Sequence, residues 1–215
     1  MQSEQFLFLL TGAWGTVKLS LLTFAFGGAL GLLVALGRVA PSAVVRRLFA
    51  TYIMLMQGTP LIVLMGVCYF GPSLAGIGSM SAMAAAAVTL TIYSSAFLGE
   101  IWRACIQAVP KSQWEAAECL GLSSSARMGR VILPQALRMA TPPSVGFLVQ
   151  IIKNTSIASL VVGYAELSYN AKILNNSTFQ PFLYFGCAVV LYFLMCYPLS
   201  RWSRTLERRL NASGS

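Results

Sequence analysis

The chain has 215 residues, of which 57% are hydrophobic and 10% are charged, and its mean hydropathy is +0.71. Soluble domains carry about 25% charged residues, so this composition excludes an ordinary soluble protein and indicates one polytopic membrane domain. The chain has no histidine, no GxxxxGK[ST] phosphate loop and no CxxC pair, which excludes a Walker-type ATPase and the common metal sites.

Apolar segments long enough to cross a bilayer as helices follow one another along the chain. They cover residues 19–37, 48–99, 142–162 and 182–199. The segment 48–99 is uncharged and has room for two spans, punctuated by Gly71 and Pro72. Pro142 and Pro143 mark the start of the next span. We therefore predict an all-α polytopic membrane protein with about five transmembrane helices.

Two local patterns bear on how these spans pack. Gly58-Thr59-Pro60 lies inside the second span and predicts a break in that helix. Gly27 and Gly31 form a GxxxG pair in the first span, and an alanine-rich stretch begins the third. Small residues at this spacing are typical of closely packed membrane helices, so we read both as packing surfaces.

Basic residues are unevenly distributed among the segments that link the spans. By the positive-inside rule, segments rich in arginine and lysine stay in the cytoplasm. Here they are Arg38, Arg46, Arg47, Lys111, Arg127, Arg130, Arg138, Arg201, Arg204, Arg208 and Arg209. The opposite side receives Glu4, the uncharged loop 71–80, and Glu166 with Lys172. We therefore predict an outside, uncleaved N-terminus and a cytoplasmic C-terminus, and the net charge of +9 reflects topology rather than nucleic-acid binding.

The segment 110–134 is charged and polar although apolar spans flank it. Ser112 and Glu115 have capping-box spacing, so a helix should start at Ser112 after Pro110 and run for about two turns. Gly121 supplies a left-handed cap. Ser123 to Ser125 can cap a return helix whose Arg127 and Arg130 face water while Met128, Val131 and Ile132 turn inward. With Ala116 and Ala117 on its surface, the first short helix is slim enough to seat in a partner's groove.

The spacing of this segment resembles the EAA signature of ABC-importer membrane subunits. The matching residues are Glu115, Ala116, Ala117, Gly121, Val131, Leu133 and Pro134. Val131 stands where the family usually has Ile. The resemblance implies a coupling helix that docks into an ATPase subunit, with Glu115, Ala116, Ala117, Gly121, Leu133 and Pro134 as its residues. The alternative is an ordinary amphipathic loop hairpin.

Five further blocks, in the order of this chain, look like those of polar amino-acid ABC permeases of the histidine/glutamine/arginine/opine type. They read GTVKLSLLTFAFGGALGLLVALGR, YIMLMQGTPLIV, GEIWRACIQAVPKSQWEAAECLG, ILPQALRMATPP and IIKNTSIASLVV. The resemblance implies the type I ABC importer fold. It also implies four kinds of partner: a second permease subunit (the same or homologous), two cytoplasmic ATPase subunits that bind ATP and magnesium, an extracytoplasmic solute-binding protein, and an amino-acid substrate. No cofactor is expected in this chain.

Two positions depart from that family's pattern. The family commonly has Arg before Gly-Thr-Pro, whereas this chain has Gln57. It often has an acidic residue after the lysine of the KxTS block, whereas this chain has Asn154 after Lys153. Either change could alter substrate preference or mark one half of a heterodimer.

Charged residues at membrane depth suggest function because each costs about 3 kcal/mol or more there. Glu100 and Arg103 can neutralise each other, or Glu100 can pair with a substrate ammonium or with Lys153. Lys153 begins a polar cluster that either interrupts its helix to bind a carboxylate or forms a buried ion pair or hydrogen-bond network. The candidate pathway residues are Gln57, Thr59, Glu100, Lys153, Asn154, Thr155 and Ser156.

Together these features predict a single ABC-importer transmembrane domain over 1–211, with a disordered tail over 212–215. The function they imply is a permease subunit of the bacterial inner membrane that moves a polar amino acid by alternating access. It would have no catalytic residues and no metal ligands of its own, and its five cysteines would be small buried apolar residues. The alternatives are a membrane scaffold or sensor that recruits an ATPase without transport, and a secondary transporter.

Overall fold

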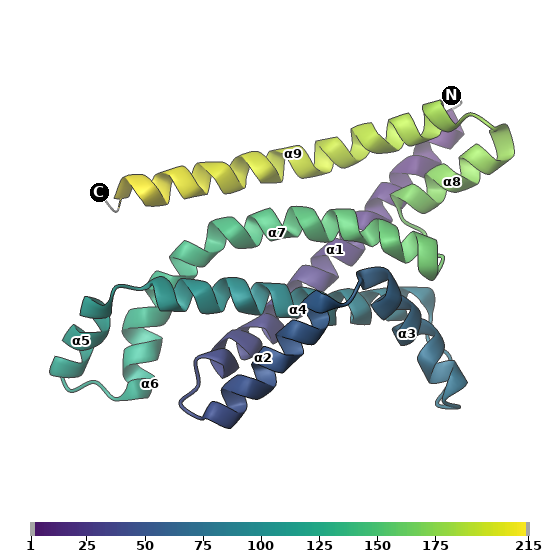
Figure 1. The fold of residues 1–215 in the computed structure, drawn as a ribbon. Coiled ribbons are helices and arrows are strands. Elements are labelled where there is room, and N and C mark those ends of the chain that lie inside the picture. The colour runs from purple at the N-terminus through teal and green to yellow at the C-terminus, as the bar shows by residue number, and fades with distance from the viewer. Residues whose placement is uncertain (1–2, 214–215) are drawn as a thin grey trace.

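A computed structural model describes residues 3–213 as helices joined by short connections (Figure 1). These residues contain no β-strand, which confirms the predicted all-α fold. In chain order the elements are α1 (Ser3–Arg38), α2 (Ala43–Gly58), α3 (Leu61–Leu74), α4 (Ala82–Ala108), α5 (Lys111–Cys119), α6 (Ser124–Arg127), a π-helical turn η1 (Met128–Ile132), α7 (Leu133–Val161), α8 (Leu167–Thr178) and α9 (Pro181–Ser213).

Four helical stretches of the described chain are long and apolar enough to cross a membrane: Ser3–Arg38, Ala82–Ala108, Ser124–Val161 and Pro181–Leu210. The pair α2 and α3 makes a fifth candidate, bent by 102° at the break between the two helices. The predicted number of about five spans is therefore confirmed.

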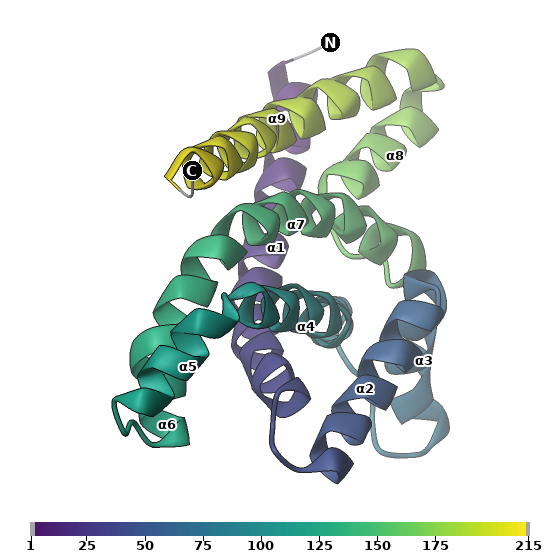
Figure 2. The same ribbon diagram turned by 60° about the vertical axis from the view of Figure 1, so that its left-hand side comes forward.

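The short helices α5 and α6 lie at the same end of the molecule as the C-terminus (Figures 1 and 2). Helix α8 and the N-terminus lie at the other end. An odd number of crossings requires this arrangement of the two termini. The cytoplasmic assignment of the end that carries α5 stays a prediction.

Helices α1 and α4 pack most closely, through small residues. A Cβ atom added at Gly31 would lie 3.0 Å from the Cβ atom of Leu98, and one added at Gly99 would lie 2.5 Å from a methyl carbon of Val34. These positions have no space for a larger side chain without displacement of a neighbour. The predicted packing role of the GxxxG pair is confirmed, since both Gly27 and Gly31 are buried in this contact.

The prediction that Pro142 and Pro143 start a span was wrong. Both lie inside α7, which begins at Leu133 and continues past them to Val161. A membrane helix can contain proline when neighbouring helices and side chains satisfy the backbone groups around it. Here the hydroxyl of Ser203 on α9 donates a 2.8 Å hydrogen bond to the carbonyl oxygen of Pro142.

The sharp break in segment 48–99 lies at Gly58-Thr59-Pro60 rather than at Gly71 and Pro72. Thr59 is extended, with φ −108° and ψ 132°, as residues before proline usually are. Pro72 lies inside the last turn of α3, which ends at Leu74. The break predicted at Gly58-Thr59-Pro60 is confirmed, and it turns the chain by 102°.

Two features of the C-terminal part were not predicted. Helix α8 occupies the segment between the last two spans and ends at Thr178, where the capping residue Phe179 has a left-handed φ of 55°. Helix α9 continues to Ser213 and so includes the first two residues of the predicted tail 212–215, whose disorder stays a prediction. Residues 214 and 215 lie outside the described residues.

Candidate functional site

The helix α5 forms the tip of the segment 110–134. It begins at Lys111, directly after the N-cap residue Pro110, whose ψ of 138° is still extended. The predicted capping box was wrong: Ser112 lies inside the first turn, and no side chain caps the helix start. The predicted length of about two turns is confirmed, since α5 has nine residues.

The end of α5 is a Schellman motif at Gly121. Gly121 has a φ of +71°, and its N–H donates a 2.9 Å hydrogen bond to the carbonyl of Glu118. The N–H of Leu122 donates a 3.2 Å bond to the carbonyl of Ala117. These two bonds satisfy carbonyls that the helix end would otherwise leave unpaired. The left-handed cap predicted at Gly121 is confirmed.

The return helix also starts as predicted. The Ser123 hydroxyl accepts a 3.3 Å hydrogen bond from the N–H of Ala126. Arg127 then reaches back to α5, where its guanidinium lies 2.8 Å from the Glu118 carboxylate. Because the Glu118 side chain is 75% exposed, this ion pair adds about 1 kcal/mol at most. It nevertheless ties the two arms of the loop together.

Helix α5 is exposed except at Trp114 and Ala117, and one stripe of it carries small or acidic side chains. The exposed residues at helical spacing are Ser112, Glu115, Ala116 and Cys119. Trp114 turns inward and packs against the buried cluster that contains Ile106 and Ile132. Ala117 is only 2% exposed, so the prediction that it lies on the surface was wrong. Its position on the inner side of the short helix leaves it no access to solvent.

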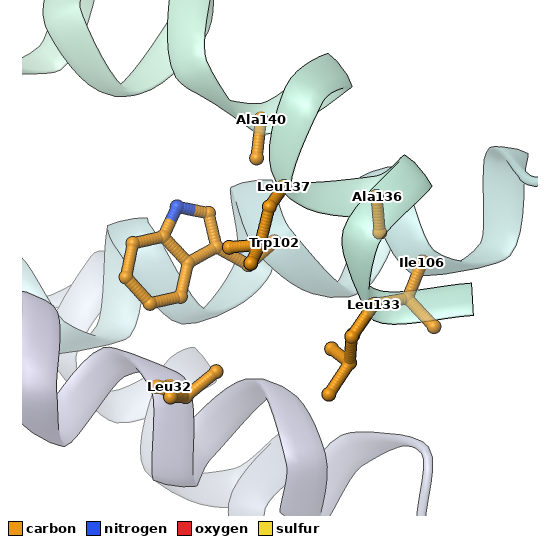
Figure 3. A pocket seen from close by; sticks show the side chains of 7 residues that line it. All are labelled: Leu32, Trp102, Ile106, Leu133, Ala136, Leu137 and Ala140. Atoms are coloured by element: carbon orange, nitrogen blue, oxygen red, sulfur yellow. The ribbon is translucent and has the colours of Figure 1, made fainter. Parts of the chain in front are cut away.

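The loop continues α4 and leads into α7, and a small apolar pocket lies where these two helices meet α1 (Figure 3). Its lining comprises Leu32, Trp102, Ile106, Leu133, Ala136, Leu137 and Ala140. The indole N–H of Trp102 donates a 2.8 Å hydrogen bond to the hydroxyl of Ser144, which joins α4 to α7. Leu133 is half-buried in this region, and Pro134 is exposed at the start of α7.

The charges of α4 neutralise each other. Arg103 donates to both oxygens of Glu100, at 2.9 Å from Nε and 2.5 Å from Nη2, and it also contacts the amide oxygen of Gln107. Arg38 lies 3.9 Å from the same carboxylate. The predicted pairing of Glu100 with Arg103 is confirmed. Pairing with Lys153 was wrong, because both arginines already occupy the carboxylate.

The polar cluster at 153–156 lies on an unbroken part of α7, so the predicted interruption was wrong. The hydroxyls of Thr155 and Ser156 donate to carbonyls three residues earlier in the helix, at 2.8 Å and 2.7 Å. The side chain of Asn154 accepts a 3.0 Å bond from Gln150. Because these polar groups are satisfied within α7, the helix needs no break, and Lys153 remains exposed.

The remaining pathway candidates lie at the break between α2 and α3. Gln57 is exposed in the last turn of α2. Thr59 is half-buried, and its hydroxyl donates a 2.8 Å bond to the carbonyl of Leu55. Among the described residues, no hydrogen bond or ion pair links Gln57 or Thr59 to Glu100 or to Lys153. The structure therefore does not bring the candidates into one bonded cluster.

Sequence reasoning missed Glu166, which is fully buried. Its carboxylate accepts hydrogen bonds from the hydroxyls of Tyr192 (2.5 Å) and Thr16 (3.2 Å) and from the N–H of Tyr169 (2.9 Å). No basic side chain in the described part of the chain forms an ion pair with it. Nearby, the hydroxyl of Tyr164 donates to the carbonyl of Gly15 at 3.2 Å. Burial, and then the Glu166 charge, raise the pKa of Tyr164, which keeps that hydroxyl protonated.

Lys18 was also left out of the predicted set of charges in spans. Helix α1 begins at Ser3, well before the predicted span, and therefore includes Lys18. The Lys18 side chain is exposed. Lys18 and Arg38 are 20 positions apart, about 30 Å along a helix and close to the thickness of a bilayer core. The uncharged segment 19–37 therefore still matches the predicted first span. The five cysteines are free, but only Cys196 is buried and Cys119 is exposed, so the prediction that all five are buried was wrong. No metal-binding cluster occurs in the described residues.

Comparison with known proteins gives a consistent result. Residues 27–212 match the family described as binding-protein-dependent transport system inner membrane component. The chain is 34% identical over 210 residues to a probable glutamine ABC transporter permease protein, GlnM, of Bacillus subtilis, covering 98% of this chain and 96% of that protein. It is 32% identical over 201 residues to the L-cystine transport system permease protein TcyB of the same organism, covering 93% and 85%.

Solved structures resemble the chain over nearly its whole length. A crystal structure of an amino acid ABC transporter with histidines matches with a TM-score of 0.89 and 32% identity, covering 96% of this chain and 95% of that one. The MetNI methionine ABC transporter in an inward-facing conformation matches with a TM-score of 0.76 and 20% identity, covering 96% and 99%. Because the identity to MetNI is only 20%, this second similarity shows the shared fold alone.

Proposed function

The chain belongs to the family of binding-protein-dependent transport system inner membrane components, and we propose that in this family it carries a polar amino acid inward by alternating access driven by separate ATPase subunits. It is a multi-pass inner-membrane protein and an amino-acid permease of the ABC importer type. What we propose beyond this is the coupling of ATP hydrolysis to transport, the residues that perform this coupling, and the subunits with which the chain assembles.

The observation that carries the proposal is the free face of α5. A helix of nine residues ends in a fixed left-handed cap, is tied to its return arm by Arg127 and Glu118, and exposes Glu115 and Ala116. An isolated helix of this length is only marginally stable in water, so the contacts at its two ends are needed to keep it folded. A short helix held rigid in this way can serve as a docking element. Movement of a partner that binds this face would be passed to α4 and α7, which flank the loop.

The buried members of the signature would act differently from the exposed ones. Glu115, Ala116 and Pro134 are exposed and can contact an ATPase subunit. Ala117 and Leu133 pack inward and would hold the helix at its angle, and Gly121 would fix its end. ATP and magnesium would be bound by the partner, because this chain has no phosphate loop.

For the substrate pathway, Lys153 is the best candidate of the predicted set. It is exposed on α7 and has no carboxylate partner in the described chain, so its ammonium is free to pair with an amino-acid carboxylate. Asn154, Thr155 and Ser156 would position this part of the helix, and Gln57 and Thr59 would contribute from the break between α2 and α3. Glu100, held by two arginines, would serve structure more than binding.

The test is ATP hydrolysis by the lipid-reconstituted complex of this chain, its companion permease and ATPase, with a panel of binding proteins and amino acids. One amino acid with its binding protein should stimulate hydrolysis, and Glu115→Lys and Gly121→Asp should each abolish the stimulation. Glu4→Lys is the charge-matched control, since Glu4 is exposed at the start of α1. If hydrolysis ignores every amino acid and both loop substitutions, the protein is a scaffold rather than an importer subunit.

The pathway role needs a separate measurement. Lys153→Met should lower transport of the stimulating amino acid while the complex still assembles with its ATPase. Lys172→Met is the control, because Lys172 is exposed on α8 and lies outside the predicted pathway. Equal transport by both variants would show that Lys153 is not part of the substrate pathway. The proposed docking role of α5 would be unaffected by that result.

A further inference from the structure

The C-terminal part of α9 carries three exposed arginines along one face. Arg201, Arg204 and Arg208 are spaced by three and four residues, which places them on one stripe of the helix. Together with Tyr197 and Thr205 they line a surface hollow. In the described residues no carboxylate forms an ion pair with any of the three. The nearest acidic residue in sequence, Glu207, lines a different hollow with Met139 and Pro142.

The arginine stripe continues an apolar stripe on the same face. One and two turns before Tyr197, the exposed residues at this spacing are Val190, Phe193 and Leu194, with 57%, 58% and 59% exposure. The 18 positions from Val190 to Arg208 extend about 27 Å along the helix. One face of α9 therefore changes from apolar to cationic along its length.

A ladder of side chains joins the two parts of this face. The rings of Phe193 and Tyr197 stack with centroids 5.0 Å apart, and the guanidinium of Arg201 lies 5.9 Å from the centroid of the Tyr197 ring. Arg201 also donates a 3.1 Å hydrogen bond to the Tyr197 hydroxyl. Only part of the Arg201 guanidinium is used in this way, and Arg204 and Arg208 have no hydrogen-bond partner among the described residues.

We propose that this face of α9 binds an anionic phospholipid, with the phosphate held by Arg201, Arg204 and Arg208 and an acyl chain lying on the apolar stripe from Val190 to Tyr197. Guanidinium groups bind phosphate oxygens in bidentate fashion, and each basic residue near a membrane surface favours anionic lipid. The ligand must offer a phosphate and an adjoining hydrocarbon chain, because the face offers cations and an adjoining apolar surface.

An acidic protein surface could also pair with three arginines. The apolar part of the face favours lipid, since a soluble partner such as an ATPase subunit would meet the arginines and leave the membrane-depth stripe uncovered. The stacked side chains from Phe193 to Arg201 connect the apolar stripe to the arginines. One lipid molecule can therefore contact the apolar stripe with its acyl chain and the arginines with its phosphate.

The experiment is native mass spectrometry of the full-length chain purified in detergent and titrated with phosphatidylglycerol or with phosphatidylcholine of the same acyl chains. Wild type should retain phosphatidylglycerol preferentially. Arg204→Gln with Arg208→Gln should lower that affinity about 25-fold, at about fivefold per arginine. The matched control is Arg47→Gln with Lys172→Gln, which removes the same charge from exposed positions on α2 and α8. All four substituted residues are exposed, so folding should be retained.

Three outcomes would overturn the proposal. Equal loss of phosphatidylglycerol in the test and control variants would show a general charge effect. Displacement of the lipid by millimolar glycerol phosphate would show a site for soluble phosphate. When the same α9 variant is co-expressed with the ATPase subunit, loss of co-purification with lipid binding unchanged would show that the arginines contact the ATPase subunit instead.

Discussion

The carboxylate of Glu166 and the hydroxyl of Tyr192 lie 2.5 Å apart, which joins the start of α8 to the middle of α9. The same carboxylate accepts a bond from Thr16 on α1, so three helices meet at one buried acidic side chain. A buried carboxyl group without a cation depends on such donors, because each one lost leaves a buried oxygen without a hydrogen-bond partner.

Tyr192→Phe should destabilise the protein by roughly 1–3 kcal/mol, since it removes a hydrogen bond to a fully buried carboxyl oxygen. The measurement is the midpoint of thermal unfolding in detergent, followed by tryptophan fluorescence. Tyr69→Phe is the control, because no hydrogen bond of the Tyr69 hydroxyl is found in the described structure. An equal fall in both variants would mean that the Glu166 contact adds no stability.

Gly15→Ala should prevent close approach of α1 to the segment before α8. A Cβ atom at Gly15 would lie 2.4 Å from the carbonyl oxygen of Ala165, which is backbone and cannot rotate away. We expect a loss of roughly 1–3 kcal/mol or failure to fold, as for other overpacked sites. Gly66→Ala, in α3, meets nothing within 4 Å and should be neutral or slightly stabilising. Comparison of expression and melting midpoint distinguishes the two sites.

A double-mutant cycle should rank the two arginines around Glu100. Arg103 makes two direct contacts with the carboxylate, whereas Arg38 lies 3.9 Å away. The coupling of Glu100→Gln with Arg103→Gln should therefore exceed that with Arg38→Gln, and because all three side chains are partly exposed it should stay near about 1 kcal/mol. The cycles use unfolding free energies at low salt. A larger coupling for Arg38 would contradict the geometry.

Substitutions at Gly121 should follow the cost of a left-handed backbone. Asn tolerates this conformation better than Ala, and β-branched Val tolerates it worst, so ATP-coupled transport should fall in the order Gly, Asn, Ala, Val. The cost for Ala is about 1–2 kcal/mol. Gly129→Ala is the control, since Gly129 lies in the same loop without a positive φ and meets nothing within 4 Å. A flat series would show that the cap is not needed for coupling.

Several features set by local chemistry could be predicted from the sequence, although the capping box at Ser112 was not among them. Gly121, the hydroxyl cap at Ser123 and the break before Pro60 depend on a few adjacent residues, and all three are confirmed. The pairing of Glu100 with Arg103 belongs to the same group, because residues three apart on a helix face each other.

Features set by distant contacts could not be predicted. Thr16 and Glu166 are 150 positions apart, so nothing near Glu166 in sequence indicates its burial. The local sequence around Pro142 predicts a helix start. The carbonyl of Pro142 is instead bonded by Ser203, 61 positions later, and a contact this distant cannot be inferred from the local sequence. The burial of Ala117 likewise depends on how α5 leans on its neighbours, which its own pattern of small residues does not specify.

The bend between α2 and α3 limits what can surround the protein in a membrane. Helix α3 has 14 residues, about 21 Å, and cannot cross a hydrocarbon core of about 30 Å without α2. As one crossing, the pair exposes non-helical peptide groups around Thr59 at intermediate depth, where lipid offers them no hydrogen bonds. That part of the surface must therefore meet water or another polypeptide, so a lone copy of this chain is incompletely solvated by a bilayer.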